Sequence, residues 1–292
     1  MKTLSVSQIQ STLHKDYGLV GRDLEVENLV HCVRGGKHVL LEGPVGVGKT
    51  FLVSAVAELL GKEVVRVDGD SRYTEQKLTG WFDPPTVLKK GYVKESYFDG
   101  PLALAMRHGS ILFVNEMNRM PEGVQNVLLP ALDEKRLEVP RIGLLEAKAG
   151  FTVIATQNPR EFVATSHLSE ALLDRFELIT LTYQSELDER QILKGATSYK
   201  NKGSANNEVL EWSLQLVRAT RHSALFKRGA SIRAGISVYD IALSMGGTWE
   251  NFLRAALIAL PTRVELSEEG IEQGFKNAIE SLAEQAKKKS RI

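Results

Sequence analysis

The sequence predicts an α/β fold in which a parallel β-sheet is followed by a smaller helical domain. Apolar runs typical of buried strands recur five times in the first two thirds of the chain, separated mostly by helical patterns. After Tyr183 the strand patterns vanish and helical patterns follow one another. We therefore expect an α/β core at residues 1–184 and an all-helical domain at residues 185–292.

The expected strands are short and apolar, which favours a buried parallel sheet with helices on both faces. They lie at residues 38–41, 64–67, 111–114, 152–155 and 178–181. The helix expected after the first strand covers residues 49–60 and ends at Gly61, a residue type common at helix C-termini. The helices of the second domain are expected at residues 186–199, 208–221, 231–245 and 249–260.

Length and composition indicate a folded protein of about two domains, because 292 residues with 43% hydrophobic content can form real cores. Lys and Arg number 37 against 36 for Asp and Glu, so no overall basic field draws the chain to nucleic acid or to a membrane surface. The single cysteine, Cys32, cannot form an internal disulfide. The N-terminus lacks a signal-peptide pattern, and no apolar stretch approaches the roughly 18 residues of a membrane span. We expect a cytoplasmic protein.

The segment with the strongest functional signal lies between the first strand and the first helix. It matches the pattern G-x-x-x-x-G-K-[ST] of loops that bind the phosphates of a nucleoside triphosphate. Gly43, Gly46 and Gly48 let the backbone amides point inward, Lys49 reaches the β- and γ-phosphates, and Thr50 offers a hydroxyl to Mg²⁺. The predicted ATP-binding residues are Gly43, Pro44, Val45, Gly46, Val47, Gly48, Lys49, Thr50 and Phe51.

Two further strand ends carry polar residues that we expect beside this loop. The strand at 111–114 runs into Asn115 and Glu116, of which Asn115 is the predicted metal-supporting residue and Glu116 the predicted base for water attack. An Asp is usual at the first of these positions, so the neutral Asn115 puts Mg²⁺ dependence and hydrolysis rate in question. Asn158 follows the strand at 152–155 and can hydrogen-bond the attacking water; Glu116 could instead be an ordinary surface carboxylate.

Four blocks of residues together resemble the AAA+ ATPases of the MoxR family, over nearly the whole chain. They are Val20-Gly21-Arg22, Phe98-Asp99-Gly100-Pro101-Leu102, Asn115-Glu116-Met117-Asn118-Arg119-Met120-Pro121 and Ala155-Thr156-Gln157-Asn158-Pro159. The resemblance implies a P-loop NTPase core of the AAA+ type with a helical lid, ATP and Mg²⁺ as cofactors, and ATP hydrolysis. It also implies a homo-oligomeric ring, expected to be a hexamer, that remodels a partner protein as a chaperone does, with a protein carrying a von Willebrand factor A domain as adaptor.

The resemblance assigns three further residues to catalysis. Asn158 would be the first sensor, Arg175 the arginine finger that reaches the ATP of a neighbouring subunit, and Arg233 the second sensor in the lid. Arg175 could instead form a structural salt bridge, and Arg233 could be a solvated helix residue. Two other functions stay open: a scaffold that binds ATP but hydrolyses it poorly, suggested by Asn115, and a nucleic-acid motor, against which the near-neutral charge argues.

Two insertions resemble the mechanical parts of this family. Residues 83–98, with a turn expected at 89–92, and residues 136–148 are both expected to form hairpins. In a ring they would face the central channel or the partner, with Tyr92, Tyr97, Lys89 and Lys90 as gripping residues. Equally, each could be an ordinary hairpin that covers a helix.

Overall fold

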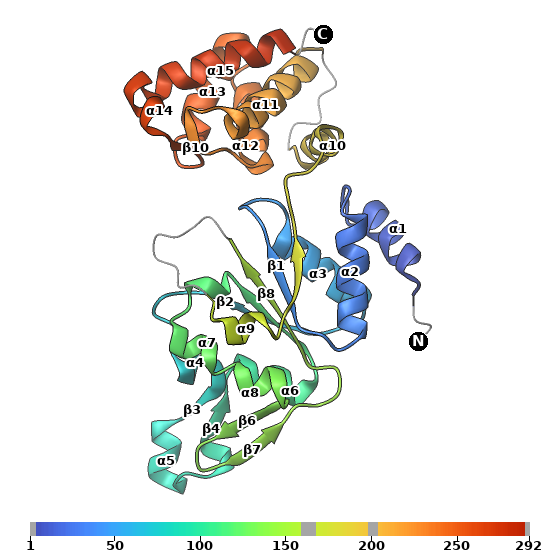
Figure 1. The fold of residues 1–292 in the computed structure, drawn as a ribbon, viewed down its shortest axis with the longest axis vertical. Coiled ribbons are helices and arrows are strands. Elements are labelled where there is room, and N and C mark those ends of the chain that lie inside the picture. Colours follow the sequence, from blue (N-terminus) through green and yellow to red (C-terminus); the bar gives the residue numbers. More distant parts are fainter. Residues whose placement is uncertain (1–3, 159–167, 198–203, 290–292) are drawn as a thin grey trace. The chain divides into compact units, whose positions relative to one another are not determined.

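The computed structural model describes residues 4–158, 168–197 and 204–289 and divides into two compact units (Figure 1). The first unit contains the chain up to Pro44 together with Gly48–Thr182, and the second contains Val45–Val47 and the chain from Tyr183 onward. Among the helices of the described part, none combines the length and the apolar character needed to cross a bilayer.

A five-stranded parallel sheet forms the centre of the first unit (Figure 1). Its strand order is β2-β5-β8-β1-β9. The strands are β1 (Val39–Glu42), β2 (Val64–Asp68), β5 (Ile111–Asn115), β8 (Thr152–Gln157) and β9 (Glu177–Thr180). All five agree with the predicted strands to within two residues. The prediction succeeds because β5 and β8 are buried on both faces and therefore read as continuous apolar runs.

Helices cover both faces of this sheet. Helices α1 (Val6–Asp16), α2 (Asp23–Arg34) and α3 (Lys49–Leu59) pack together, with α2 against β1 and β9 and α3 against β5 and β8. The opposite face buries Leu112, Val114 and Val153 in one apolar cluster with α6 (Pro101–His108) and α8 (Leu129–Asp133). Other short helices of the first unit include α4 (Glu75–Thr79), η2 (Met117–Arg119), α7 (Glu122–Asn126) and α9 (Glu170–Leu173).

The structure corrects the prediction for residues 83–98, which do not form a hairpin with a turn at 89–92. Strands β3 (Gly80–Phe82) and β4 (Tyr97–Asp99) pair antiparallel, and the chain between them forms α5 (Pro84–Lys90) and η1 (Lys94–Ser96). The Asp83 carboxylate caps α5 by accepting hydrogen bonds from the Thr86 backbone and hydroxyl, and Pro84 suits the first helical position. The N-cap at Asp83 and the proline at the first helical position favour a helix here, although the alternating apolar and polar residues resemble a strand.

Residues 136–148 form the predicted hairpin, in which β6 (Arg136–Val139) pairs antiparallel with β7 (Gly143–Glu146). The structure brings the two insertions together, because the Arg141 guanidinium lies 3.8 Å from the centre of the Tyr92 ring. Tyr97 is partly buried and donates its hydroxyl hydrogen bond to the Thr79 carbonyl at 2.9 Å. Whether these segments line a channel stays a prediction.

The second unit contains α10 (Glu186–Ala196), α11 (Ser204–His222), α12 (Ile232–Ser244), α13 (Trp249–Ala259), α14 (Glu268–Gln273) and α15 (Phe275–Lys289). The first four correspond to the predicted helices, although α11 begins four residues earlier than expected. The expectation of an all-helical domain needs one correction, because β10 (Phe226–Arg228) and β11 (Glu265–Leu266) form a two-stranded antiparallel sheet. Both strands are too short to produce a periodic signal.

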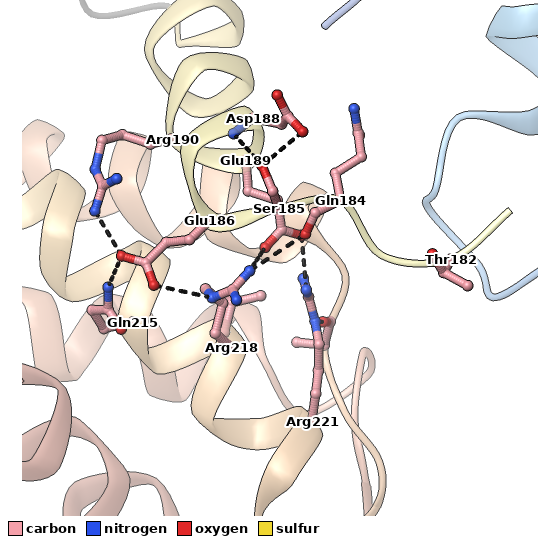
Figure 2. Close-up of polar contacts among 12 residues, drawn as sticks. Thr182, Gln184, Ser185, Glu186, Asp188, Glu189, Arg190, Gln215, Arg218 and Arg221 are labelled. Atoms are coloured by element: carbon pink, nitrogen blue, oxygen red, sulfur yellow. Dashed lines mark hydrogen bonds and ion pairs between the residues drawn. The ribbon is translucent and has the colours of Figure 1, made fainter. Parts of the chain in front are cut away.

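A buried carboxylate joins α10 to α11 in this unit. Figure 2 shows Glu189 between two arginines of α11: its oxygens lie 2.8 Å from Arg218 Nη1 and 2.7 Å from Arg221 Nη1. The Glu189 side chain is 2% exposed and the Arg221 side chain 6%. Glu186 extends the network by accepting hydrogen bonds from Arg190 and Gln215, both at 2.8 Å. Since a buried charge is costly without a partner, this network specifies which face of α10 meets α11.

His38 is a structural histidine at the start of β1. It is buried between the rings of Phe151 and Phe176. Its Nδ1 accepts the Val153 amide hydrogen at 2.9 Å, so the proton resides on Nε2, which donates to the Leu132 carbonyl at 3.2 Å. Burial lowers the pKa of His38 from 6.5 to about 4, because the charged ring would lose its hydration.

We predict that His38 makes the first unit less stable in acid. The pKa is lower in the folded than in the unfolded state, so the stabilisation is present above pH 6.5 and is lost as the pH falls toward 4. Between pH 7 and pH 5 this residue should reduce the free energy of unfolding by about 2 kcal/mol. Urea unfolding should therefore show a smaller loss over this range in His38→Gln, whereas His31→Gln, at an exposed site, should lose as much as the parent.

Candidate nucleotide-binding site

The phosphate-binding loop leaves the C-terminal end of β1 and leads into α3. Gly46 and Gly48 have φ angles of 83° and 95°, in the left-handed region that glycine tolerates best. Gly43 must be small for a further reason, because a Cβ there would lie 2.2 Å from the Leu181 carbonyl oxygen. Its small size permits the chain after β9 to approach β1.

Lys49 and Thr50 begin α3, where the free backbone amides and the positive end of the helix dipole attract anions. The Lys49 ammonium lies over the loop and donates hydrogen bonds to the carbonyls of Gly43 and Pro44. The Thr50 hydroxyl donates to Asn115 Oδ1 at 3.3 Å. The side chains of Val45 and Phe51 are exposed, and Val47 is buried.

Asn115 lies at the centre of a chain of polar contacts at the ends of three strands. Its Oδ1 accepts hydrogen bonds from Thr50 and, at 3.0 Å, from the Thr156 hydroxyl. Its Nδ2 donates to Asp68 Oδ1 at 2.9 Å. The Arg66 guanidinium, and to a smaller extent the Asn115 amide, hold the pKa of the Asp68 carboxyl below its ordinary value.

Glu116 has an unusual backbone conformation. Its φ of 57° places it in the left-handed region, which costs a residue with a side chain about 1–2 kcal/mol. The strain is offset locally, since the Glu116 amide donates to the Thr156 hydroxyl at 2.8 Å. The carboxylate is 34% exposed and pairs with Arg119 Nε at 3.1 Å, so it remains accessible to a reactant.

Asn158 is buried at the end of β8, between β5 and β1, and Pro159 of the same block lies outside the described residues. Arg175 follows α9 and makes the structural salt bridge that we considered as its alternative role. Its Nε and Nη2 lie 2.7 and 2.6 Å from Asp133 Oδ2, and its Nη1 donates to the Ala171 carbonyl. The Arg175 side chain is nevertheless 28% exposed.

Arg233 belongs to the second unit, where it lies in the first turn of α12 with an exposed side chain. Ser231 takes the N-cap position of α12 with extended backbone, but its hydroxyl makes no capping hydrogen bond. The structure thus brings together Lys49, Thr50, Asn115 and Glu116 around one loop. The roles of Asn158, Arg175 and Arg233 as sensors and finger stay predictions.

Sequence reasoning missed two residues of this site, Thr156 and Asp68. Thr156 is fully buried, and its hydroxyl contacts both Asn115 and Glu116. Its signal was visible, because Thr156 is a polar residue near the C-terminal end of a buried strand, directly after the apolar residues Val153, Ile154 and Ala155. Asp68 ends β2, and its position beside Asn115 depends on β2 lying next to β5, which the chain order does not reveal.

The parallel sheet and the loop at its C-terminal edge are those of a P-loop nucleotide-binding fold. Residues 38–176 match the family of AAA domains of the dynein-related subfamily. An uncharacterized protein of Staphylococcus epidermidis is 28% identical over 246 residues, which cover 84% of this chain and 90% of that protein. The uncharacterized protein YojN of Bacillus subtilis is 29% identical over 209 residues, which cover 71% of this chain and 67% of YojN.

Solved structures share the fold. A candidate ATPase from Cytophaga hutchinsonii superimposes with a TM-score of 0.53 at 24% identity, covering 96% of this chain and 93% of that one. A point mutant of RuvB from Thermotoga maritima gives a TM-score of 0.55 at 17% identity, covering 87% of this chain and 72% of RuvB. These similarities agree with the predicted fold class, a parallel-sheet core followed by a helical region.

We predict that the Thr156 hydroxyl stabilises the site. Thr156→Val should leave the partly buried Glu116 amide without its acceptor and reduce the free energy of unfolding by about 1–3 kcal/mol. Thr152→Val is the matched control, because Thr152 is buried in the same strand and its hydroxyl makes neither contact. Equal unfolding free energies of the two variants in urea would contradict this role.

Proposed function

We propose that the protein is an ATPase that assembles into a homo-oligomeric ring in the cytoplasm and uses ATP hydrolysis to remodel a partner protein. The observation that carries the proposal is the contact of Thr50 with Asn115 beside Glu116. It joins the phosphate-binding loop to a strand end that carries an accessible carboxylate. A glycine-rich loop with a purely structural role would not require an accessible carboxylate beside it.

The residues of the first unit suit the chemistry of phosphoryl transfer. The amides at the start of α3 and the Lys49 ammonium would bind the phosphates, and Glu116 would orient the attacking water and accept its proton. Thr50 and Asn115 offer hard oxygen donors, which suit Mg²⁺. When bound, Mg²⁺ would neutralise charge that develops on the phosphates. Asn158 and Arg233 would act as sensors of the γ-phosphate.

The ring and its partner rest on the resemblance to MoxR proteins. We propose a hexamer in which Arg175 completes the site of a neighbouring subunit, and a protein with a von Willebrand factor A domain as adaptor. For Arg175 to act in this way, its guanidinium must leave Asp133 when a neighbour binds, and its partial exposure is compatible with such an exchange.

A second candidate function is a scaffold that binds ATP and assembles but hydrolyses ATP poorly. The neutral amide of Asn115 favours it, because an Asp would add charge at the metal. A nucleic-acid motor is a weaker candidate, since the net charge of +1 provides no general attraction to phosphate backbones. Phosphate release by the parent protein in the presence of Mg²⁺ separates the first two functions.

We predict that Glu116→Gln binds ATP but hydrolyses it at least about a hundredfold more slowly, as expected for loss of a general base. Calorimetric titration measures the binding and phosphate release the turnover. Lys49→Ala should instead lose tight ATP binding, because the cation that pairs with the phosphates is gone. Glu122→Gln, an exposed carboxylate of α7, is the control and should keep the parent rate. Parent-like turnover of Glu116→Gln would rule out the assignment of Glu116.

We predict that Arg175→Ala protomers bind ATP but lose activity, and that mixing them with Lys49→Ala protomers restores part of it. Loss of an arginine finger can cost roughly 10³ to 10⁵ in rate. In mixed rings, Arg175 of the Lys49→Ala protomer can complete the ATP site of the Arg175→Ala protomer. Phosphate release across mixing ratios measures the rescue, after mass measurement has established that mixed rings form.

The contact with Asp133 requires its own control in this experiment. Asp133→Asn weakens the ion pair but keeps the arginine, so it should retain the parent rate if Arg175 acts on a neighbour. If Asp133→Asn loses as much activity as Arg175→Ala, the ion pair is structural and the trans role is refuted. Absence of rescue in confirmed mixed rings would refute it as well.

A further inference from the structure

The last residues of β2 and β5 form an acid–amide pair at the edge of the candidate site. Asp68 and Asn115 are register partners in the parallel sheet, and their side chains meet with Asn115 Nδ2 2.9 Å from Asp68 Oδ1. Asp68 lies on the edge strand, with its side chain 60% exposed. The pair therefore joins solvent at the sheet edge to the polar contacts beside the phosphate-binding loop.

The carboxylate decides which way the Asn115 amide points. An ionised carboxylate only accepts hydrogen bonds, so the NH₂ group of Asn115 must face Asp68. The carbonyl oxygen of the amide then faces the opposite side, where it accepts hydrogen bonds from the hydroxyls of Thr50 and Thr156. Asp68 thus turns an oxygen, and not an amide hydrogen, toward the predicted metal-binding hydroxyl of Thr50.

The backbone holds Asp68 in this place, and Arg66 pairs with its exposed side. The next residue, Gly69, donates its amide hydrogen to the Asn115 carbonyl at 2.7 Å, and a Cβ on Gly69 would lie 2.1 Å from the Glu116 carbonyl oxygen. Only glycine permits so close an approach. On the other side, Arg66 contacts both carboxylate oxygens, the shortest distance being 2.7 Å from Nη2 to Oδ1.

We propose that Asp68 is a positioning residue for a divalent cation held with the nucleotide phosphates. It orients the Asn115 carbonyl oxygen toward the cation and supplies, one side chain away, the negative charge that the amide lacks. Asn115 then supplies the oxygen and Asp68 the negative charge that a single carboxylate at the end of β5 would supply. This inference rests on the proposed nucleotide-binding function and adds a residue to its metal site.

The test measures Mn²⁺ affinity in the presence of ADP by electron paramagnetic resonance, which requires no turnover. Asp68→Asn should weaken Mn²⁺ binding about 10- to 100-fold, the range found when outer partners of metal ligands are removed. Arg66→Gln is the matched control, because it removes the ion pair but leaves the contact between Asp68 and Asn115 intact. The Mn²⁺ affinity of Arg66→Gln should stay within about a factor of five of that of the parent, because an exposed ion pair contributes little.

Exchanging the two groups tests the pair itself. Asn115→Asp alone places two carboxylates side by side, and their repulsion should lower the melting temperature of the protein without metal. The double variant Asp68→Asn with Asn115→Asp again has one acid and one amide. It should recover the melting temperature that Asn115→Asp alone loses. It should also bring the Mn²⁺ affinity that Asp68→Asn alone loses back to within about a factor of five of the parent.

Several results would overturn the inference. Unchanged Mn²⁺ affinity in Asp68→Asn, or an equal loss in Arg66→Gln, would reduce Asp68 to half of an exposed ion pair. A double variant no better than Asp68→Asn would show that the two side chains do not act together. In each of these cases the parent still binds Mn²⁺ with ADP, so the proposed function stands; a parent that binds ADP without Mn²⁺ would contradict the metal site as a whole.

Discussion

The candidate site depends on the parallel register of the central sheet. Because β2, β5, β8 and β1 run in the same direction, their C-terminal ends meet at one edge, where each strand delivers a polar residue. The backbone hydrogen bonds between the strands are enough to align these C-terminal ends, whatever the side chains are. A slip of one residue between β5 and β8 would turn the apolar residues of a strand to the other face, so core packing also keeps the site in register.

Within this frame one buried hydroxyl organises the polar groups. Thr156 accepts the Glu116 amide hydrogen and donates to Asn115, so it joins the strained backbone of the predicted base to the predicted metal-supporting amide. Such contacts are strong in the low-dielectric interior, where an unpaired polar group is costly. The backbone strain at Glu116 is therefore offset by a hydrogen bond of its own amide.

Local patterns predicted much of this structure, and distant contacts explain what they missed. Strand positions and the loop with Lys49 follow from short apolar runs and glycine spacing. The contacts of Asp68 with Asn115 and of Arg175 with Asp133 do not follow from local patterns. The partners lie 47 and 42 residues apart along the chain. The prediction for the segment after Asp83 failed for a different, local reason: its alternation resembled a strand, but helix end signals prevailed. Pairing of β10 with β11 is equally non-local.

The position of β2 at the edge of the sheet has a consequence beyond nucleotide chemistry. An edge strand exposes unpaired backbone groups, to which a strand of another molecule can add. On β2 the exposed face carries Arg66 and Asp68, whose charges would have to be desolvated by any added strand. Substitutions that make this pair apolar would therefore favour self-association.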